Sequence, residues 1–156
     1  MIDLIREQDD LKAHEHIFYL WPTKWRAFVN ARITGWNTLR LAEPGKDSLP
    51  DTPGVYTLLI QPGIAAHPHC SFLMYVGKAM SLRRRFKQYL TSEQRETGRP
   101  MIFRLLSLYP DHVWFSYTPT DRRYLDEVEA ALISAYIPPC NKDLPADISP
   151  VRGAFR

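Results

Sequence analysis

The chain has 156 residues, of which 45% are hydrophobic and 24% charged, a size and composition that suit one domain with a proper core and one appendage. Its net charge of +3 is too small to indicate a partner. Two cysteines without CxxC spacing, Cys70 and Cys140, exclude a zinc ribbon and a disulfide framework. Because no apolar run reaches transmembrane length and the acidic N-terminus is unlike a signal peptide, we expect a cytoplasmic protein with no membrane partner.

The first third of the chain predicts a helical and aromatic extension. Residues 1 to about 12 predict an amphipathic helix that docks through its apolar residues, and residues 17–36 interleave aromatic with basic side chains. Such a segment either stacks on nucleic-acid bases or packs the extension onto its domain, and we favour packing. A loop rich in proline follows at 43–53, so we place the domain boundary there, with an extension over 1–48 and a second domain over 49–156.

Two strands are predicted next. Residues 54–60 and 72–76 are rich in β-branched and aromatic side chains, which predicts an antiparallel pair. The loop between them, 62–71, is longer than an ordinary hairpin turn and is expected to project, where it is a candidate contact for a substrate or partner.

The stretch 75–90, YVGKAMSLRRRFKQYL, reads as strand, turn and helix. Gly77 is expected to end the strand, and Ser81 to cap a helix that begins near Leu82. Arg85 and Tyr89 flank the apolar stripe of this helix, where an arginine must have a partner or meet a ligand. The solvent-facing basic residues of the helix form a candidate phosphate-binding patch: Arg83, Arg84 and Lys87.

The C-terminal part predicts a buried helix over 100–109, a strand over 113–118, and a final helix that is capped by Thr120 or Asp121 and runs to about Tyr136. Glu129 falls in the middle of the inward stripe of that last helix. A carboxylate there costs several kcal/mol unless it is paired with an arginine or bound to a hard cation such as Mg²⁺. Both explanations stay open at this point.

Taken in order, these motifs resemble the GIY-YIG nuclease family. The matching pieces lie between about residues 51 and 143, and their order and spacing carry the resemblance: Gly54-Val55-Tyr56, Tyr75-Val76-Gly77-Lys78, Arg85, Tyr89, Glu129 and Pro138-Pro139-Cys140-Asn141. The chain departs from the family pattern by having Val in place of Ile in both tripeptides and a longer loop between them. The resemblance implies an α+β fold, with a three-stranded antiparallel sheet flanked by helices.

The resemblance also implies an activity, the hydrolysis of phosphodiester bonds in DNA with one divalent cation, Mg²⁺ or Mn²⁺. Glu129 would bind the metal and Arg85 would brace the scissile phosphate. Tyr56 would activate water, directly or through Lys78, with an adjacent ammonium favouring the phenolate form. Tyr75 and Tyr89 would position the phosphate and the nucleophile, and Gly54, Gly77 and Asn141 would be structural.

The biological role has three versions. A structure-selective or single-strand endonuclease of repair, recombination or mobile DNA comes first, because no separate sequence-reading domain is visible. A restriction or defence endonuclease comes second, and a catalytically silent nucleic-acid-binding module third. One domain supplies one set of catalytic groups, so a monomer should nick one strand, and double-strand cleavage would call for a homodimer or a second cleavage event.

Overall fold

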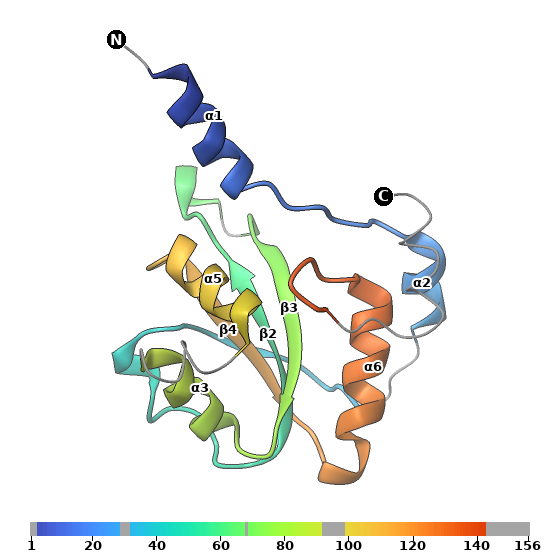
Figure 1. Cartoon of the computed structure of the whole chain (residues 1–156). Coiled ribbons are helices and arrows are strands. Elements are labelled where there is room, and N and C mark those ends of the chain that lie inside the picture. Colours follow the sequence, from blue (N-terminus) through green and yellow to red (C-terminus); the bar gives the residue numbers. More distant parts are fainter. Residues whose placement is uncertain (1–2, 29–31, 68, 92–98, 143–156) are drawn as a thin grey trace.

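The computed structural model describes residues 3–28, 32–67, 69–91 and 99–142, and it folds them as an α+β protein. An antiparallel sheet of four strands in the order β1-β4-β2-β3 forms the centre (Figure 1). The strands are β1 (Asn37–Arg40), β2 (Gly54–Ile60), β3 (Phe72–Ala79) and β4 (Val113–Pro119). The helices are α1 (Leu4–Ala13), α2 (Pro22–Ala27), α3 (Leu82–Leu90), α5 (Pro100–Leu108) and α6 (Leu125–Tyr136).

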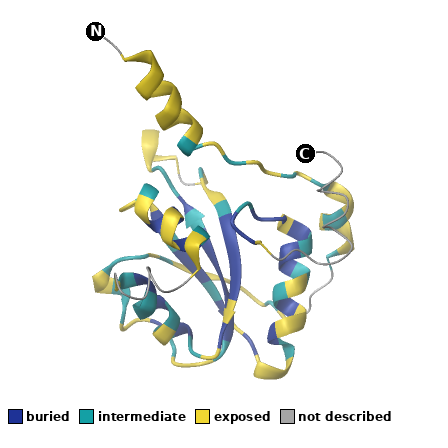
Figure 2. Ribbon diagram, viewed as in Figure 1, coloured by how far each residue is buried: buried dark blue, intermediate teal, exposed yellow. Residues whose placement is uncertain are grey.

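Helices cover both faces of the sheet, because strand residues alternate between two apolar clusters. Tyr56 and Leu58 of β2 join α3 and α5 in the larger cluster. Val55 of β2 and Val76 of β3 point the other way and pack on α6. The central strands are accordingly buried along most of their length (Figure 2).

A bulge in the β2–β3 pair breaks that alternation at one place. Leu58 pairs with Tyr75 while Leu59 pairs with Leu73, so Met74 is an extra residue on β3. Met74 and Tyr75 are consecutive, yet both are buried in the cluster under α3 and α5. The bulge thus sets the face on which Tyr75 lies.

The fold class is the predicted one, but some predicted boundaries were wrong. The sheet has a fourth strand, β1, which lies inside the predicted extension and pairs with β4. Its four residues, Asn37–Arg40, are too few to give a clear alternating pattern. Strand β3 does not end at Gly77, as predicted, but continues to Ala79. Asp121 caps a short 3-10 turn over Arg122–Tyr124, so α6 begins only at Leu125. At the other end of α6, Tyr136 is 46% exposed.

The predicted docking of the N-terminal helix was also wrong. Helix α1 forms, with Asp3 as its N-cap, but it buries no residue and projects from the domain (Figures 1 and 2). The apolar residues expected to dock are largely exposed: Leu4 at 75%, Ile5 at 74% and Leu11 at 72%. Capping and local helix propensity therefore account for α1, without tertiary packing.

The segment after α1 attaches to the domain at a few points. His14 Nδ1 and His16 Nε2 lie 3.1 and 2.7 Å from the hydroxyl of Tyr109, at the end of α5. Further along, α2 packs against α6, and Phe28 reaches the cluster under α6. The loop before β2 contributes Leu49, which is fully buried in the larger cluster. Division of the chain near residue 48 stays a prediction.

None of the described helices is long and apolar enough to cross a membrane.

Candidate active site

The candidate site is built around β3, which lies at the edge of the sheet. Tyr75 and Gly77 lie on the face covered by α3 and α5, whereas Val76 and Lys78 lie on the face covered by α6, because successive strand residues alternate. No further strand follows β3 in the described sheet, so side chains from both of its faces can meet around its outer edge.

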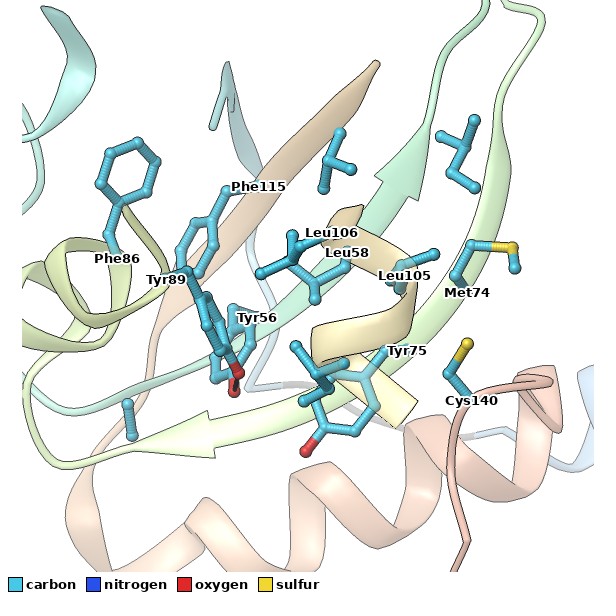
Figure 3. Packing of buried hydrophobic residues seen from close by; sticks show 14 of the residues in the cluster. Tyr56, Leu58, Met74, Tyr75, Phe86, Tyr89, Leu105, Leu106, Phe115 and Cys140 are labelled. Carbon is cyan, nitrogen blue, oxygen red and sulfur yellow. Dashed lines mark hydrogen bonds between the residues drawn. The ribbon is translucent and has the colours of Figure 1, made fainter. Parts of the chain in front are cut away.

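Three tyrosines meet on the α3 and α5 face. The hydroxyl groups of Tyr56 and Tyr89 share a hydrogen bond of 2.5 Å, and the ring centroids of Tyr56 and Tyr75 are 6.1 Å apart. Figure 3 shows the Tyr56 and Tyr89 hydroxyls in contact and the Tyr75 hydroxyl pointing to the same side of the apolar cluster. Stacking of Tyr56 on Phe115, with centroids 4.8 Å apart, fixes the central ring.

Gly77 makes room for these rings. It is paired with Tyr56 across the two strands, and a Cβ atom there would lie 2.7 Å from Cζ and Oη of Tyr56 and 2.7 Å from Cε1 of Tyr75. Any side chain would therefore displace one or both tyrosines. Gly54 is similarly constrained, because its Cβ would lie 2.6 Å from Leu82 Cδ1 at the start of α3.

Burial, and not a neighbouring cation, dominates the ionisation of the tyrosines. Removal from solvent raises the pKa of Tyr56 well above its usual value and raises the pKa of Tyr89 to about 12. It also raises the pKa of Tyr75. The nearby Arg85 guanidinium opposes this shift at all three tyrosines without reversing it. None of these tyrosines has its pKa lowered by the protein groups around it, and a phenolate favoured by an ammonium and a bound cation stays a prediction.

Helix α3 supplies Arg85 and Tyr89. It begins at Leu82 as predicted, because the Ser81 hydroxyl accepts a hydrogen bond from the Arg84 N–H at 3.1 Å. Nε of Arg85 is buried and has no hydrogen-bond partner among the described residues. A buried guanidinium nitrogen without an acceptor is costly in a finished core, and it is the arrangement expected where an anionic ligand supplies the acceptor.

Lys78 and Glu129 meet on the other face. The Lys78 ammonium lies 2.6 Å from Glu129 Oε2 and 2.7 Å from Asp126 Oδ1, and both carboxylates belong to α6. These contacts raise the pKa of Lys78, with Asp126 the larger cause. Glu129 is 16% exposed, whereas Asp126 is 89% exposed. The partner of Glu129 in the structure is a lysine and not the predicted arginine, and binding of a hard cation by Glu129 stays a prediction.

Lys78 does not contact Tyr56 in this arrangement. The two carboxylates of α6 occupy its ammonium group, on the face of the sheet opposite to the tyrosines. Activation of water by Tyr56 through Lys78 would therefore require that the lysine leave at least one carboxylate.

A cavity of about 450 Å³ joins the two halves of the site at the outer edge of β3. Tyr75 and Lys78 of β3, Glu129 of α6 and Arg99 before α5 all line it. Its remaining wall contains apolar side chains, including Ile102 and Ile133. Tyrosine, lysine, carboxylate and arginine therefore face one solvent-accessible space, which is large enough for a small ligand group.

Asn141 ties the end of α6 to the edge of β3. Its Oδ1 accepts a hydrogen bond from the Val76 N–H and its Nδ2 donates one to the Val76 carbonyl, both at 2.9 Å. The Cys140 N–H donates to the Met74 carbonyl, also at 2.9 Å. This short segment pairs with backbone groups that an edge strand would otherwise leave open. Burial raises the pKa of the Cys140 thiol to about 11.

The predicted phosphate-binding patch on α3 is only partly free. Arg83 Nε donates to the Leu49 carbonyl at 2.8 Å, and the Lys87 ammonium lies 2.9 Å from Asp47. Arg84 is exposed. Two of the three basic residues therefore stabilise the loop before β2, and binding of nucleic acid by the patch stays a prediction.

Two site residues were not singled out from the sequence. Asp126 lies three residues before Glu129, a spacing that places both on one flank of α6. Arg99 donates a hydrogen bond from its guanidinium to the Tyr75 hydroxyl and faces the cavity. Nothing in the sequence signals the Arg99 contact, because it depends on how α5 enters the fold.

The donor set fits a single hydrated hard cation. Glu129 is the one carboxylate lining the cavity, and the described residues contain no group of three or more metal-ligating side chains. Mg²⁺ commonly takes one or two protein carboxylates and completes its shell with water and substrate oxygens.

Comparison with known proteins gave matches among solved structures. No family model and no curated protein matches the chain. The chain is similar to the GIY-YIG N-terminal endonuclease domain of UvrC from Thermotoga maritima in its magnesium-bound form, with a TM-score of 0.44 and 23% sequence identity over 63% of this chain and 92% of that chain. A point mutant of that domain bound to its catalytic divalent cation gives 0.45 and 22% over 64% and 93%.

Proposed function

We propose that this protein is a divalent-metal-dependent DNA endonuclease of the GIY-YIG type. The observation that carries the proposal is the buried Nε of Arg85, which has no acceptor among the described residues and lies beside three tyrosines. A phosphodiester would supply that acceptor, and a guanidinium complements the oxygens of a phosphate on which negative charge develops. Glu129 and Tyr75 share a cavity at the same strand edge.

Within this proposal, each site residue has one role. Glu129 holds the cation, which supplies charge that polarises the phosphoryl group when bound. The oxygen of a water molecule attacks phosphorus while the Tyr56 phenolate takes the water proton; the bond from phosphorus to the leaving oxygen breaks, and that oxygen takes a proton from solvent. Tyr89 holds Tyr56 through the 2.5 Å hydrogen bond between their hydroxyls. Arg85 braces the phosphate, and Tyr75 positions it.

Lys78 acts as the counter-ion of Glu129 while no cation is bound. A carboxylate has two oxygens, so Oε1 of Glu129 can bind the cation while Oε2 keeps its contact with the Lys78 ammonium. This arrangement avoids a half-buried carboxylate without a positive partner in either state.

A structure-selective or single-strand substrate is the version we prefer, in repair, recombination or mobile DNA. One set of catalytic groups nicks one strand, and a site-specific restriction enzyme acting as a dimer is the alternative. The long connection between β2 and β3 favours neither version.

The test compares the protein with its Glu129→Gln variant on supercoiled plasmid, single-stranded DNA, branched duplex and RNA, each with Mg²⁺, Mn²⁺ or EDTA. Glu127→Gln is the matched control, because Glu127 lies on the same helix and its side chain is 62% exposed. Cleavage should require metal, disappear in Glu129→Gln and persist in Glu127→Gln. Binding without cleavage under every condition would contradict the enzyme and leave a nucleic-acid-binding module.

A further inference from the structure

Arg99 contacts the site from an element that the motif residues do not include. It immediately precedes α5, donates a hydrogen bond from Nη1 to the Tyr75 hydroxyl, and has its guanidinium carbon 5.8 Å from the centroid of the Tyr75 ring. The residue is exposed overall, but its side chain lines the cavity that contains Glu129 and Lys78. The Tyr75 hydroxyl therefore holds one end of the Arg99 guanidinium in place, while the rest of the guanidinium faces solvent.

The guanidinium of Arg99 has donors to spare. An arginine carries five N–H donors, and the Tyr75 hydroxyl is the one hydrogen-bond acceptor that the described residues offer to Arg99. Glu129 lines the same cavity but is paired with Lys78 at 2.6 Å. Guanidinium donors that face this cavity suit a phosphate, whose oxygens can accept two parallel N–H donors.

The cavity is larger than one phosphate group needs. Its volume of about 450 Å³ lies in the range of pockets that hold small molecules. Lys142 supplies a further positive charge to its lining, and Ile102, Met101 and Ile133 supply apolar surface. Cationic and apolar walls together match a nucleotide, which has an anionic backbone and an apolar base face.

We propose that Arg99 and Lys142 bind the phosphate next to the scissile one, so that the cavity holds the adjoining nucleotide of the cleaved strand. The proposal rests on the proposed nuclease function and extends it. Arg85, from α3, serves the scissile phosphate, and Arg99, from the start of α5, serves its neighbour. Arg99 is thereby a substrate-positioning residue that also orients the Tyr75 phenol.

The test measures binding of a fluorescent single-stranded oligonucleotide in the Glu129→Gln background, which prevents cleavage. Arg99→Gln should weaken binding roughly tenfold, the effect of losing one hydrogen bond between charged groups. It should also reduce the slope of log K against log salt by about 0.7, the value for one phosphate contact on a single strand. Arg99→Lys keeps the charge and should keep the slope.

The matched control is Arg104→Gln, because Arg104 lies on α5, the helix that Arg99 precedes, is exposed, and lines a different pocket with His16. It should leave both affinity and slope unchanged. In the cleaving enzyme, Arg99→Gln should raise KM more than it lowers kcat. Thermal unfolding of each variant shows whether it is folded.

Two results would overturn the proposal while leaving the nuclease intact. One is an unchanged salt slope in a folded Arg99→Gln variant of an active enzyme. The other is a Tyr75→Phe variant that reproduces every effect of Arg99→Gln, because Arg99 would then act solely through the Tyr75 hydroxyl. Absence of cleavage by the unmodified protein would instead contradict the proposed function itself.

Discussion

Gly77 shows how a single missing side chain permits the tyrosine cluster. Gly77→Ala places a methyl group 2.7 Å from atoms of Tyr56 and Tyr75, which must then move. We expect a loss of about 1–3 kcal/mol in unfolding free energy, the usual cost of overpacking. Urea unfolding measures it. Gly35→Ala is the control, because nothing lies within 4 Å of a Cβ atom at Gly35, and equal losses at both glycines would contradict the steric explanation.

The tyrosine pKa values predict how activity depends on pH. Burial raises the pKa of Tyr56, so the phenol is neutral at pH 7 and its phenolate fraction grows tenfold for each unit of pH. If the phenolate takes the water proton, log kcat/KM should rise with a slope of about one between roughly pH 7 and 9. A pH–rate profile with DNA substrate measures this slope.

Substitution of Tyr56 tests the same assignment. Tyr56→Phe should lower kcat about 100-fold or more, the range of a general base, and should flatten the profile. Persistence of the full slope in Tyr56→Phe would assign the proton to another group. Circular dichroism should show an unchanged fold, because the phenylalanine ring keeps the stacking on Phe115.

At the scale of elements, the end of α6 and the edge of β3 behave as one unit. Asn141→Ala removes both hydrogen bonds to Val76 and leaves a buried backbone N–H and C=O without partners. We expect a loss of about 1–3 kcal/mol in unfolding free energy. Asn141→Asp keeps the acceptor for the Val76 N–H but loses the donor. Its unfolding free energy in urea denaturation should therefore lie between those of the unmodified protein and Asn141→Ala. A neutral effect of both variants would show that the tie is not stabilising.

The elements that the sequence predicted well have strong local signals. The run from Gly54 to Ile60 is β-branched and bounded by turn residues, and β2 has those same limits. Ser81 marks the start of α3 because its hydroxyl can accept from the backbone three residues on. The end of β3, strand β1 and the docking of α1 were mispredicted because they have no such local signal. Their behaviour depends on contacts, or on missing contacts, with residues distant in sequence.

The site residues also divide into those with a signal in the sequence and those that depend on packing. The motif residues were recognised from their order along the chain, and the structure places Tyr56, Tyr75 and Tyr89 together and pairs Lys78 with Glu129. Arg99 and the raised tyrosine pKa values depend on packing, namely the entry of α5 and the depth of burial. Periodicity predicts which face a side chain occupies but not what meets it there.

At the scale of the molecule, the N-terminal segment is tested by two truncations. Deletion of residues 1–13 should leave the unfolding midpoint unchanged, because α1 buries no residue. Deletion of residues 1–45 removes β1 and its pairing with β4, and should lower the midpoint by several degrees. Differential scanning calorimetry of the three proteins decides between these outcomes. A large effect of the shorter deletion would show that α1 contributes to stability.

The same pair of truncations bears on DNA binding. Loss of affinity with a smaller salt slope on removal of residues 1–13 would assign phosphate contacts to α1. We expect no change, because α1 carries Asp3, Glu7, Asp9 and Asp10 against Arg6 and Lys12. The interleaved aromatic and basic residues of the N-terminal extension lie after α1, at residues 17–36.

The position of β1 has a consequence for the order of folding. Asn37 pairs with Tyr117, so β1 cannot join the sheet until the chain has been made as far as β4, whereas β2 and β3 can pair as a local hairpin. Contacts between residues so far apart in sequence form late and slow folding. During synthesis β1 therefore stays unpaired until β4 has been made, and its open backbone groups expose the nascent chain to aggregation in that interval.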